Sequence, residues 1–206
     1  MLRKFLFGMG ALAAFAGAAQ ADMVITEWMY SGAGGEFIEF TNVGASPIDM
    51  AGWSYDDDSG IAGTVDLSAF GTVDAGESVI LTEIDAAVFA SEWGLSGVSI
   101  IGGNTVNLSR NDVIYLFDDL DAVADVLAYG DQTYAGTIRT QDTSGIPSSP
   151  AALGANDVYQ WQFAVVADAF GSYASLSGNV GNPGVYVPEP ASVALLALGA
   201  LALRRR

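Results

Sequence analysis

The stretch Glu36-Phe37-Ile38-Glu39-Phe40-Thr41-Asn42 is the part of this chain that decides its expected fold. Side chains alternate between the two faces of a β-strand, so Glu39 shares a face with Phe37 and lies opposite Glu36. The two glutamates cannot form one site as an adjacent pair. We expect them in structural or surface positions, since strand alternation leaves one face solvated. A glycine-rich loop separates this run from Met23–Tyr30, a second β-rich segment, and the pattern predicts two strands.

Short apolar runs separated by turn residues continue along the chain. Those expected to form strands are Ser78–Thr82, Val98–Ile101, Val113–Phe117, Ala122–Tyr129 and Val158–Val166. One helix is expected at residues 86–93, with Asp85 as its N-cap and Gly94 after its last turn. Gly130–Asn156 is rich in Gly, Ser, Thr and Pro, which predicts a long surface loop, and Gly178–Gly184 predicts another. This order predicts an all-β fold of the sandwich type with one short helix.

The core of the sandwich is expected to hold large apolar side chains from these runs. They are Trp28, Phe37 or Ile38, Trp53, Leu81, Ile114 and Leu116. Two positions indicate turns. Asn42 can open a turn through its side chain, and Gly52 allows a turn or a close approach.

Charge is distributed very unevenly along the 206 residues. The chain has 24 acidic and 7 basic residues, with no His and no Cys. Between Asp22 and Val187 only Arg110 and Arg139 oppose the acids, which leaves a net charge of about −21 (2 minus 23). Nucleic-acid binding depends on cations that neutralise phosphates, so we expect no nucleic-acid partner. Without cysteine, the domain must be stabilised by its core alone.

The amino terminus has the three parts of a secretory signal peptide. Two basic residues precede the apolar run Phe5–Ala18, and Ala19 and Ala21 match the A-x-A cleavage pattern. We therefore expect a signal-peptide helix at residues 1–21 and a mature start at Asp22. A short amino-terminal membrane anchor is the alternative.

Residues 187–206 form a second processing segment. Pro188, Glu189 and Pro190 precede an apolar run at 191–203, and Arg204, Arg205 and Arg206 follow it. As a helix, this run is about 20 Å long, shorter than the roughly 30 Å hydrocarbon core of a bilayer. The arginines would hold its end on the cytoplasmic side. A short transmembrane helix of this kind suits a temporary anchor, and a plain carboxyl-terminal anchor is the alternative.

The order of Pro-Glu-Pro, apolar helix and arginine cluster resembles the PEP-CTERM sorting signal of Gram-negative bacteria. The resemblance runs from Pro188 to Arg206. It implies that Pro188, Glu189 and Pro190 are recognised by a membrane-embedded exosortase, after the secretion machinery has exported the chain. It also implies a secreted or cell-surface protein of a bacterium that makes exopolysaccharide.

The segment between the two signals resembles a lamin tail domain. The residues that carry the resemblance keep its order: Ile25–Tyr30, Gly35–Asn42, Ile48–Trp53, Asp74–Thr82, Asp112–Phe117, Ala128–Gly130 and Gly178–Gly184. The resemblance implies an immunoglobulin-like β-sandwich over residues 22–186. Gly130–Asn156 departs most from the pattern. The nuclear and nucleic-acid roles of lamin tail domains elsewhere are not expected here, because of the acidic charge.

The residue inventory argues against an enzyme. The mature chain lacks His, Cys and Lys, which removes the usual general base, thiol nucleophiles and Schiff-base chemistry. A nucleophile elbow and a P-loop are also missing from the sequence. A carboxylate pair could still hydrolyse glycosides. With 23 acids in the mature span, however, two within reach are expected by chance, and no pair stands out.

Two oxygen-rich turns are candidate calcium sites, and no other cofactor is expected. The first contains Asp56, Asp57 and Asp58, and the second contains Asp118, Asp119 and Asp121. Calcium takes six to eight oxygen ligands, but neither turn has the spacing of an EF-hand loop. Solvated acids in turns are the simpler interpretation.

These observations favour a non-catalytic module with a structural or adhesive role in the cell envelope or exopolysaccharide matrix. Extracellular polysaccharide or other envelope proteins are its expected partners. The contacts would use bridging cations or exposed aromatic residues such as Tyr55, Tyr134 or Tyr173. A calcium-dependent adhesive protein is the second hypothesis, and a secreted hydrolase that uses carboxylates is the third.

Overall fold

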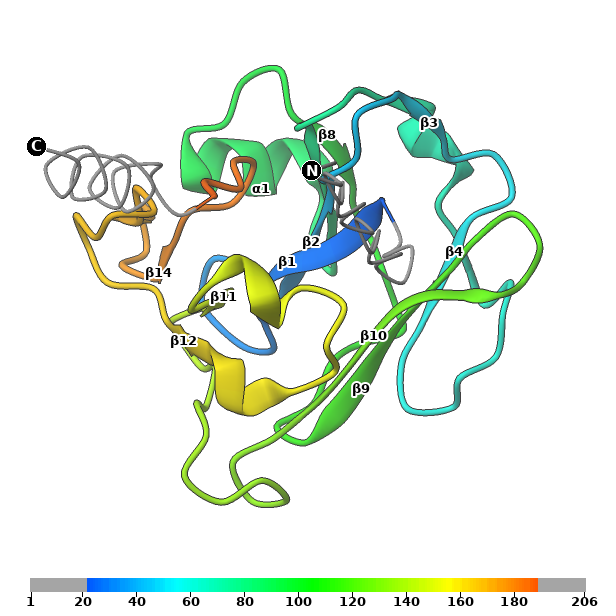
Figure 1. Ribbon diagram of the computed structural model, residues 1–206. Helices are drawn as coiled ribbons and strands as arrows, with labels where there is room; N and C mark the ends of the chain where they lie inside the picture. Colours follow the sequence, from blue (N-terminus) through cyan, green and yellow to red (C-terminus); the bar gives the residue numbers. More distant parts are fainter. Residues whose placement is uncertain (1–21, 189–206) are drawn as a thin grey trace, which may run out of the picture.

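Two β-sheets face each other in the computed structural model, which describes residues 22–188 (Figure 1). The larger sheet runs in the spatial order β12 (Trp161–Phe163), β11 (Gly145–Pro147), β1 (Met23–Met29), β2 (Phe37–Asn42), β7 (Ser78–Thr82) and β8 (Ser99–Ile101). The smaller runs β10 (Val123–Tyr129), β9 (Asp112–Phe117), β4 (Ser54–Asp56) and β5 (Val65–Asp66). Neighbouring strands are antiparallel except for β7 and β8, which are parallel.

Smaller elements cover the edges and one outer face. They are the helix α1 (Ala86–Trp93), the strand pairs β3 (Ile48–Asp49) with β6 (Thr72–Val73) and β13 (Tyr173–Ala174) with β14 (Val180–Gly181), and the 3₁₀ turns η1 (Ser68–Phe70), η2 (Pro150–Ala152) and η3 (Val158–Gln160). No helix within residues 22–188 has both the length and the apolar character needed to cross a membrane. The expected signal-peptide helix and the apolar helix at 191–203 lie outside the described residues.

The main core fills the space between the two sheets around Trp28. The indole of Trp28 is fully buried, and its ring centre lies 5.3 Å from that of Tyr129 and 4.8 Å from that of Trp161. The other buried members include Ile38, Phe40, Leu81, Ile114 and Leu116. Aromatic pairs at such distances add attraction beyond the burial of apolar area. The core of the sandwich is therefore organised around one tryptophan of β1.

A second core lies on the opposite face of the larger sheet, beneath α1. Phe89 and Trp93 of the helix pack against Phe37 of β2, with ring centres 5.4 and 5.7 Å away. The Asp85 side chain accepts from the first free backbone amides of the helix, and Gly94 ends it in the left-handed conformation. β1, β2 and β7 are buried on both faces as a result.

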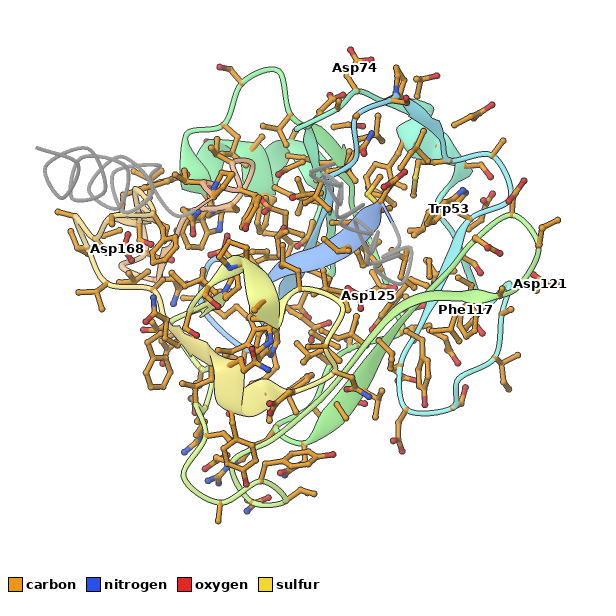
Figure 2. The ribbon with its side chains drawn as sticks, in the orientation of Figure 1. Trp53, Asp74, Phe117, Asp121, Asp125 and Asp168 are labelled. Carbon is orange, nitrogen blue, oxygen red and sulfur yellow. The ribbon has the colours of Figure 1, made fainter. Side chains whose placement is uncertain are left out.

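The two sheets are joined where β1 and β10 meet. Both strands have an irregular register there, between Ile25 and Glu27 in β1 and between Val123 and Asp125 in β10. The carboxylate of Asp125 accepts from the Ile25 amide at 2.8 Å, and Figure 2 shows Asp125 in the interior. Burial raises the pKa of Asp125 to about 6. A backbone donor left without a strand partner by the bulge is satisfied in this way.

Much of the expected architecture is confirmed. The chain folds as an all-β, immunoglobulin-like sandwich with one short helix at residues 86–93, and Ser78–Thr82 is a strand as predicted. Of the expected core residues, Trp28, Phe37, Ile38, Leu81, Ile114 and Leu116 are buried. Trp53 is only half-buried. The Asn42 side chain holds a turn by accepting from the Gly44 amide at 3.0 Å.

Three expectations about loops and strands are wrong. Gly130–Asn156 is not entirely a surface loop, because it contains β11, which is buried beside β1. Val158–Val166 is a strand only at Trp161–Phe163, since η3 precedes it. Gly178–Gly184 contains β14. β11 is the clearest case, because its partner β1 is more than a hundred residues away in the sequence and determines the conformation of a short segment.

Gly145 tests the packing of β11 on the main core. A Cβ atom at this position would lie 2.7 Å from the ring of Trp28 and 2.8 Å from Ile138. Because the indole is enclosed, we expect Gly145→Ala to lower the free energy of unfolding by about 1–3 kcal/mol in urea titrations. Leu120→Ala, at a side chain that is 80% exposed, is the control and should change it by less than about 0.5 kcal/mol. Equal effects would show that β11 is loosely packed.

Candidate functional site

The segment at residues 178–186, called the strap below, crosses the helix side of the larger sheet. Within it, β14 pairs with β13, and Tyr173 of β13 packs edge-on against Trp93 and donates its hydroxyl to the Trp93 carbonyl at 2.8 Å. In Figure 1 the strap is the orange segment beside α1. It is the last part of the chain before the predicted sorting motif at 188–190.

Alternate backbone amides of the strap bind side chains on three neighbouring strands. Asn182 N–H donates to Glu27 Oε1 of β1 at 2.9 Å, and Gly184 N–H donates to Glu39 Oε2 of β2 at 2.6 Å. The amide of residue 186 donates to Ser78 Oγ of β7 at 3.3 Å. These three contacts, called the ladder below, advance by one strand for every two residues of the strap.

Hydroxyl groups bond to the same three acceptors. Thr26 donates to Glu39 Oε1 at 2.6 Å, and the hydroxyl oxygens of Thr26 and Thr41 are 2.7 Å apart. Thr41 and Ser78 are also 2.7 Å apart, and Ser144 donates to Glu27 Oε1. Glu39 and Ser78 therefore belong to one network of side chains on β1, β2 and β7, and Glu27 is bound separately by Ser144.

Glu27 and Glu39 stand directly opposite each other in the pairing of β1 with β2, and each is only 1% exposed. Burial raises the pKa of both carboxyl groups, and their mutual repulsion raises that of Glu27 further. Two facing carboxylates cannot both ionise cheaply away from water. The pair therefore holds a proton at pH values where exposed glutamates are fully charged.

Two buried acceptor atoms in this network have no hydrogen-bond donor within residues 22–188. They are Glu27 Oε2 and Asn182 Oδ1, and the two residues are in contact through the Asn182 amide. Protonation of Glu27 would turn its oxygen from an acceptor into a donor. The unsatisfied atoms thus agree with a neutral carboxyl group at Glu27.

Glu36 and Glu39 lie on opposite faces of the sheet, as the alternation predicts, but neither face is solvated. Glu36 is 4% exposed and accepts from the Leu108 amide at 2.8 Å, and burial raises its pKa to about 8. The expectation of a solvated face is wrong because α1 and the strap cover the side of the sheet away from the main core. Sequence reasoning also missed Glu27, although an acid inside an apolar run was a visible signal.

The acidic turns use their carboxylates to close loops. Asp56 is buried and accepts from Ser59 Oγ at 2.5 Å and from the Ile61 amide at 2.6 Å, whereas Asp57 and Asp58 flank that loop. Asp118 accepts from two amides of the hairpin that also holds Asp119 and Asp121. Among the residues described, no three acidic side chains converge where they could hold a metal ion.

The predicted processing residues lie mostly outside the described part. Asp22 and Pro188 are exposed at its two ends, and Pro188 lines a pocket with Thr41, Asn42 and residues 43, 44, 76 and 186. The residues outside it are Ala19, Ala21, Glu189, Pro190, Arg204, Arg205 and Arg206.

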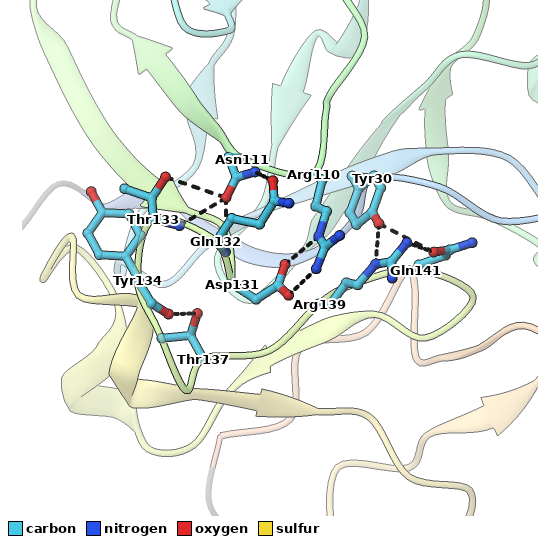
Figure 3. Close-up of polar contacts among 10 residues, drawn as sticks. All are labelled: Tyr30, Arg110, Asn111, Asp131, Gln132, Thr133, Tyr134, Thr137, Arg139 and Gln141. Carbon is cyan, nitrogen blue, oxygen red and sulfur yellow. Dashed lines mark hydrogen bonds and ion pairs between the residues drawn. The ribbon is translucent and has the colours of Figure 1, made fainter.

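The two arginines of residues 22–188 occupy one polar face, called the arginine face below (Figure 3). Arg110 forms a two-bond ion pair with Asp131, at 2.7 and 2.5 Å. Arg139 is exposed, donates to Tyr30 Oη at 2.9 Å and to Gln141, and forms no salt bridge within residues 22–188. The two guanidinium groups of this face are therefore each held in place by planar side chains, Asp131 for Arg110 and Tyr30 with Gln141 for Arg139.

The same face continues towards two tyrosines. The Asn111 side chain organises the loop after β10. Its oxygen accepts from the backbone amides of residues 132 and 133, and its nitrogen donates to the Gln132 side chain. Tyr134 follows, with its ring edge-on to that of Tyr159, which is 62% exposed.

Of the aromatic residues expected at the surface, Tyr134 and Tyr173 are half-buried, but Tyr55 is fully buried and donates to the Val106 carbonyl. Tyr55 belongs to the core because it lies on the inner face of β4.

Two family models match the chain. The model described as Lamin Tail Domain matches residues 16–131, more than half of the sequence. The chain belongs to the lamin tail domain family. A model described as PEP-CTERM protein-sorting motif matches residues 187–206. No curated protein and no solved structure shows a significant match.

The two matches cover the first part of the chain and its carboxyl terminus, and they leave residues 132–186 between them. This lamin tail domain protein carries an exosortase sorting signal and is therefore an extracellular, surface-sorted protein. The lamin tail match ends at residue 131, after β10, and the sorting match begins at residue 187. β11 to β14 and the strap lie between them, so they connect the family domain to the sorting signal.

The buried acids make stability depend on pH. Glu27, Glu36 and Glu39 have raised pKa values when folded, so the native state binds more protons than the unfolded chain above pH 4.5. Stability is then greatest near pH 4.5 and decreases as the pH rises towards 8. We expect the free energy of unfolding, measured in urea, to fall by at least about 2 kcal/mol over this range.

Glu39→Gln should flatten this profile, because it removes one titrating group but keeps an acceptor for the Gly184 amide. Asp74→Asn removes the same single negative charge at an exposed position. It should leave the slope of the unfolding free energy against pH unchanged. Parallel profiles for wild type and Glu39→Gln would mean that general charge repulsion, and not the buried pair, causes the pH dependence.

Proposed function

We propose that the protein is a non-catalytic adhesive module of the cell envelope or exopolysaccharide matrix of a Gram-negative bacterium. In this proposal residues 1–21 are removed on export, residues 22–186 are the working domain, and the tail is processed by exosortase. The arginine face carries the proposal. It is the place where both arginines of a very acidic domain and several amide side chains come together (Figure 3), and the exposed Tyr159 packs against Tyr134 at its end.

Such a face suits the hydroxyl groups of a polysaccharide. Amide groups donate and accept in fixed planes, guanidinium groups donate in a fixed plane, and a tyrosine ring offers an apolar surface with a polar tip. The charge of the rest of the domain opposes a strongly anionic polymer. We therefore favour a neutral or weakly charged polysaccharide, contacted by Arg139 and Tyr159.

The position of the acid pair supports a non-catalytic role. Glycoside hydrolysis needs two carboxyl groups that reach the substrate from either side of the bond. Glu27 and Glu39 are 1% exposed and lie beneath the strap, where a sugar chain cannot enter. A facing acid pair would favour a hydrolase, but this pair is enclosed by the protein itself.

The processing part of the proposal predicts the mass of the extracellular form. The polypeptide of this species should begin at Asp22 and end close to Pro188, because the signal peptide and the sorting tail are both removed. Intact mass spectrometry of the surface fraction measures this. A carboxyl terminus that still includes Arg204–Arg206 would contradict exosortase processing.

The adhesive part predicts binding to the exopolysaccharide of the producing bacterium. Tyr159→Ala and Arg139→Gln should each reduce co-sedimentation about tenfold, since each removes one main contact of the face. Leu120→Ala, on the distant β9–β10 hairpin, is the control and should bind as wild type does. Undiminished binding by both variants would refute this face, and loss of binding with a chelator would favour calcium bridging instead.

A further inference from the structure

The sorting motif begins two residues after the last contact of the ladder. The amide of residue 186 binds Ser78, and Pro188 lies in a pocket beside Thr41 and Asn42. From Gly184, whose amide binds Glu39, to Pro188 the chain can extend at most about 14 Å. The docked strap therefore holds the start of the motif against the surface of its own domain.

An enzyme that processes an extended peptide needs the backbone on both sides of its recognition element. Extended segments are typically bound through their main-chain hydrogen-bonding groups. In the docked strap, three of those donors already bind Glu27, Glu39 and Ser78. The folded domain and the enzyme thus compete for the same backbone amides.

We infer that the strap must leave the ladder before exosortase can process the chain, so that Glu27, Glu39 and Ser78 act as positioning residues for sorting. This inference rests on the proposed exosortase processing and adds the step that controls it. The rate of sorting is then proportional to the fraction of molecules with a released strap.

The ladder has the features of a contact that can open without unfolding the sandwich. The strap lies on the face of the sheet away from the main core, and its own residues contribute none of the core aromatic groups. Its last contact, from the amide of residue 186 to Ser78 Oγ, is a long hydrogen bond of 3.3 Å to a neutral acceptor. Such a bond contributes little net stability, which lowers the cost of releasing this end of the strap.

Gly184→Ala tests the inference from the strap itself. Gly184 has a φ of +92°, and a Cβ atom there would lie 2.8 Å from Val98, so the substitution weakens docking without changing the core between the sheets. Ser78→Ala removes one acceptor of the ladder from the sheet side. Each full-length variant is expressed in the native host, and the conversion of pulse-labelled precursor to processed extracellular protein is followed by mass spectrometry.

Both variants should be processed about tenfold faster than wild type. Gly171→Ala is the matched control, because it places the same methyl group at a similar φ of +82° with nothing within 4 Å, and it should be processed at the wild-type rate. Cooperative thermal unfolding of each purified variant verifies that the sandwich has formed.

Unchanged or slower processing of Gly184→Ala and Ser78→Ala, with wild type processed normally, would overturn the inference and leave the proposed function intact. Slower processing would show that the docked strap is the form the enzyme recognises. A wild-type chain that keeps its tail would instead contradict exosortase processing itself.

Discussion

The burial of two facing carboxyl groups, on Glu27 and Glu39, is the constraint on which the rest of this structure depends. They lie on strands whose other face forms the core of the sandwich, so they cannot move to solvent without disrupting that core. A buried carboxyl group needs hydrogen-bond partners and a reduced charge. The strap supplies backbone donors, threonine and serine hydroxyls donate to the same carboxyl groups, and α1 covers the neighbouring surface. The acid pair thereby connects the family domain to the segment that leads to the sorting signal.

Local signals were sufficient for much of the fold. The helix at 86–93 was predictable because its N-cap, its terminal glycine and the i,i+4 pair of Phe89 and Trp93 all lie within ten residues. The strand Ser78–Thr82 was predictable because a turn precedes a dense β-rich run. The sorting signal at residues 187–206 was predictable for the same reason, since it is defined by a short contiguous pattern.

Features that depend on distant partners could not be predicted in this way. Gly145–Pro147 has little strand propensity. It becomes a strand because it pairs with β1 at Trp28, whose ring leaves room for a glycine only. The pairing of Glu27 with Glu39 depends on the register of β1 with β2, including its bulge. Tyr55 was expected at the surface as a contact residue, yet its face of β4 points inwards. The arginine face joins the two ends of the β9–β10 hairpin through Arg110 and Asp131, but its contact between Arg139 and Tyr30 depends on a distant partner that no local pattern indicates.

The order of the ladder would have a mechanical consequence if the processed chain is attached through its carboxyl terminus. A pulling force would reach the amide of residue 186 first, then Gly184 and then Asn182, so the contacts would be loaded one after another and not together. Contacts that open in sequence yield at low force, while the strands of the sandwich stay out of the load path. Residues 182–186 would then lengthen into a flexible tether of at most about 18 Å, while β14 stays paired with β13. Under shear at a cell surface, the segment that seals the acid pair would serve as an extensible link that protects the fold.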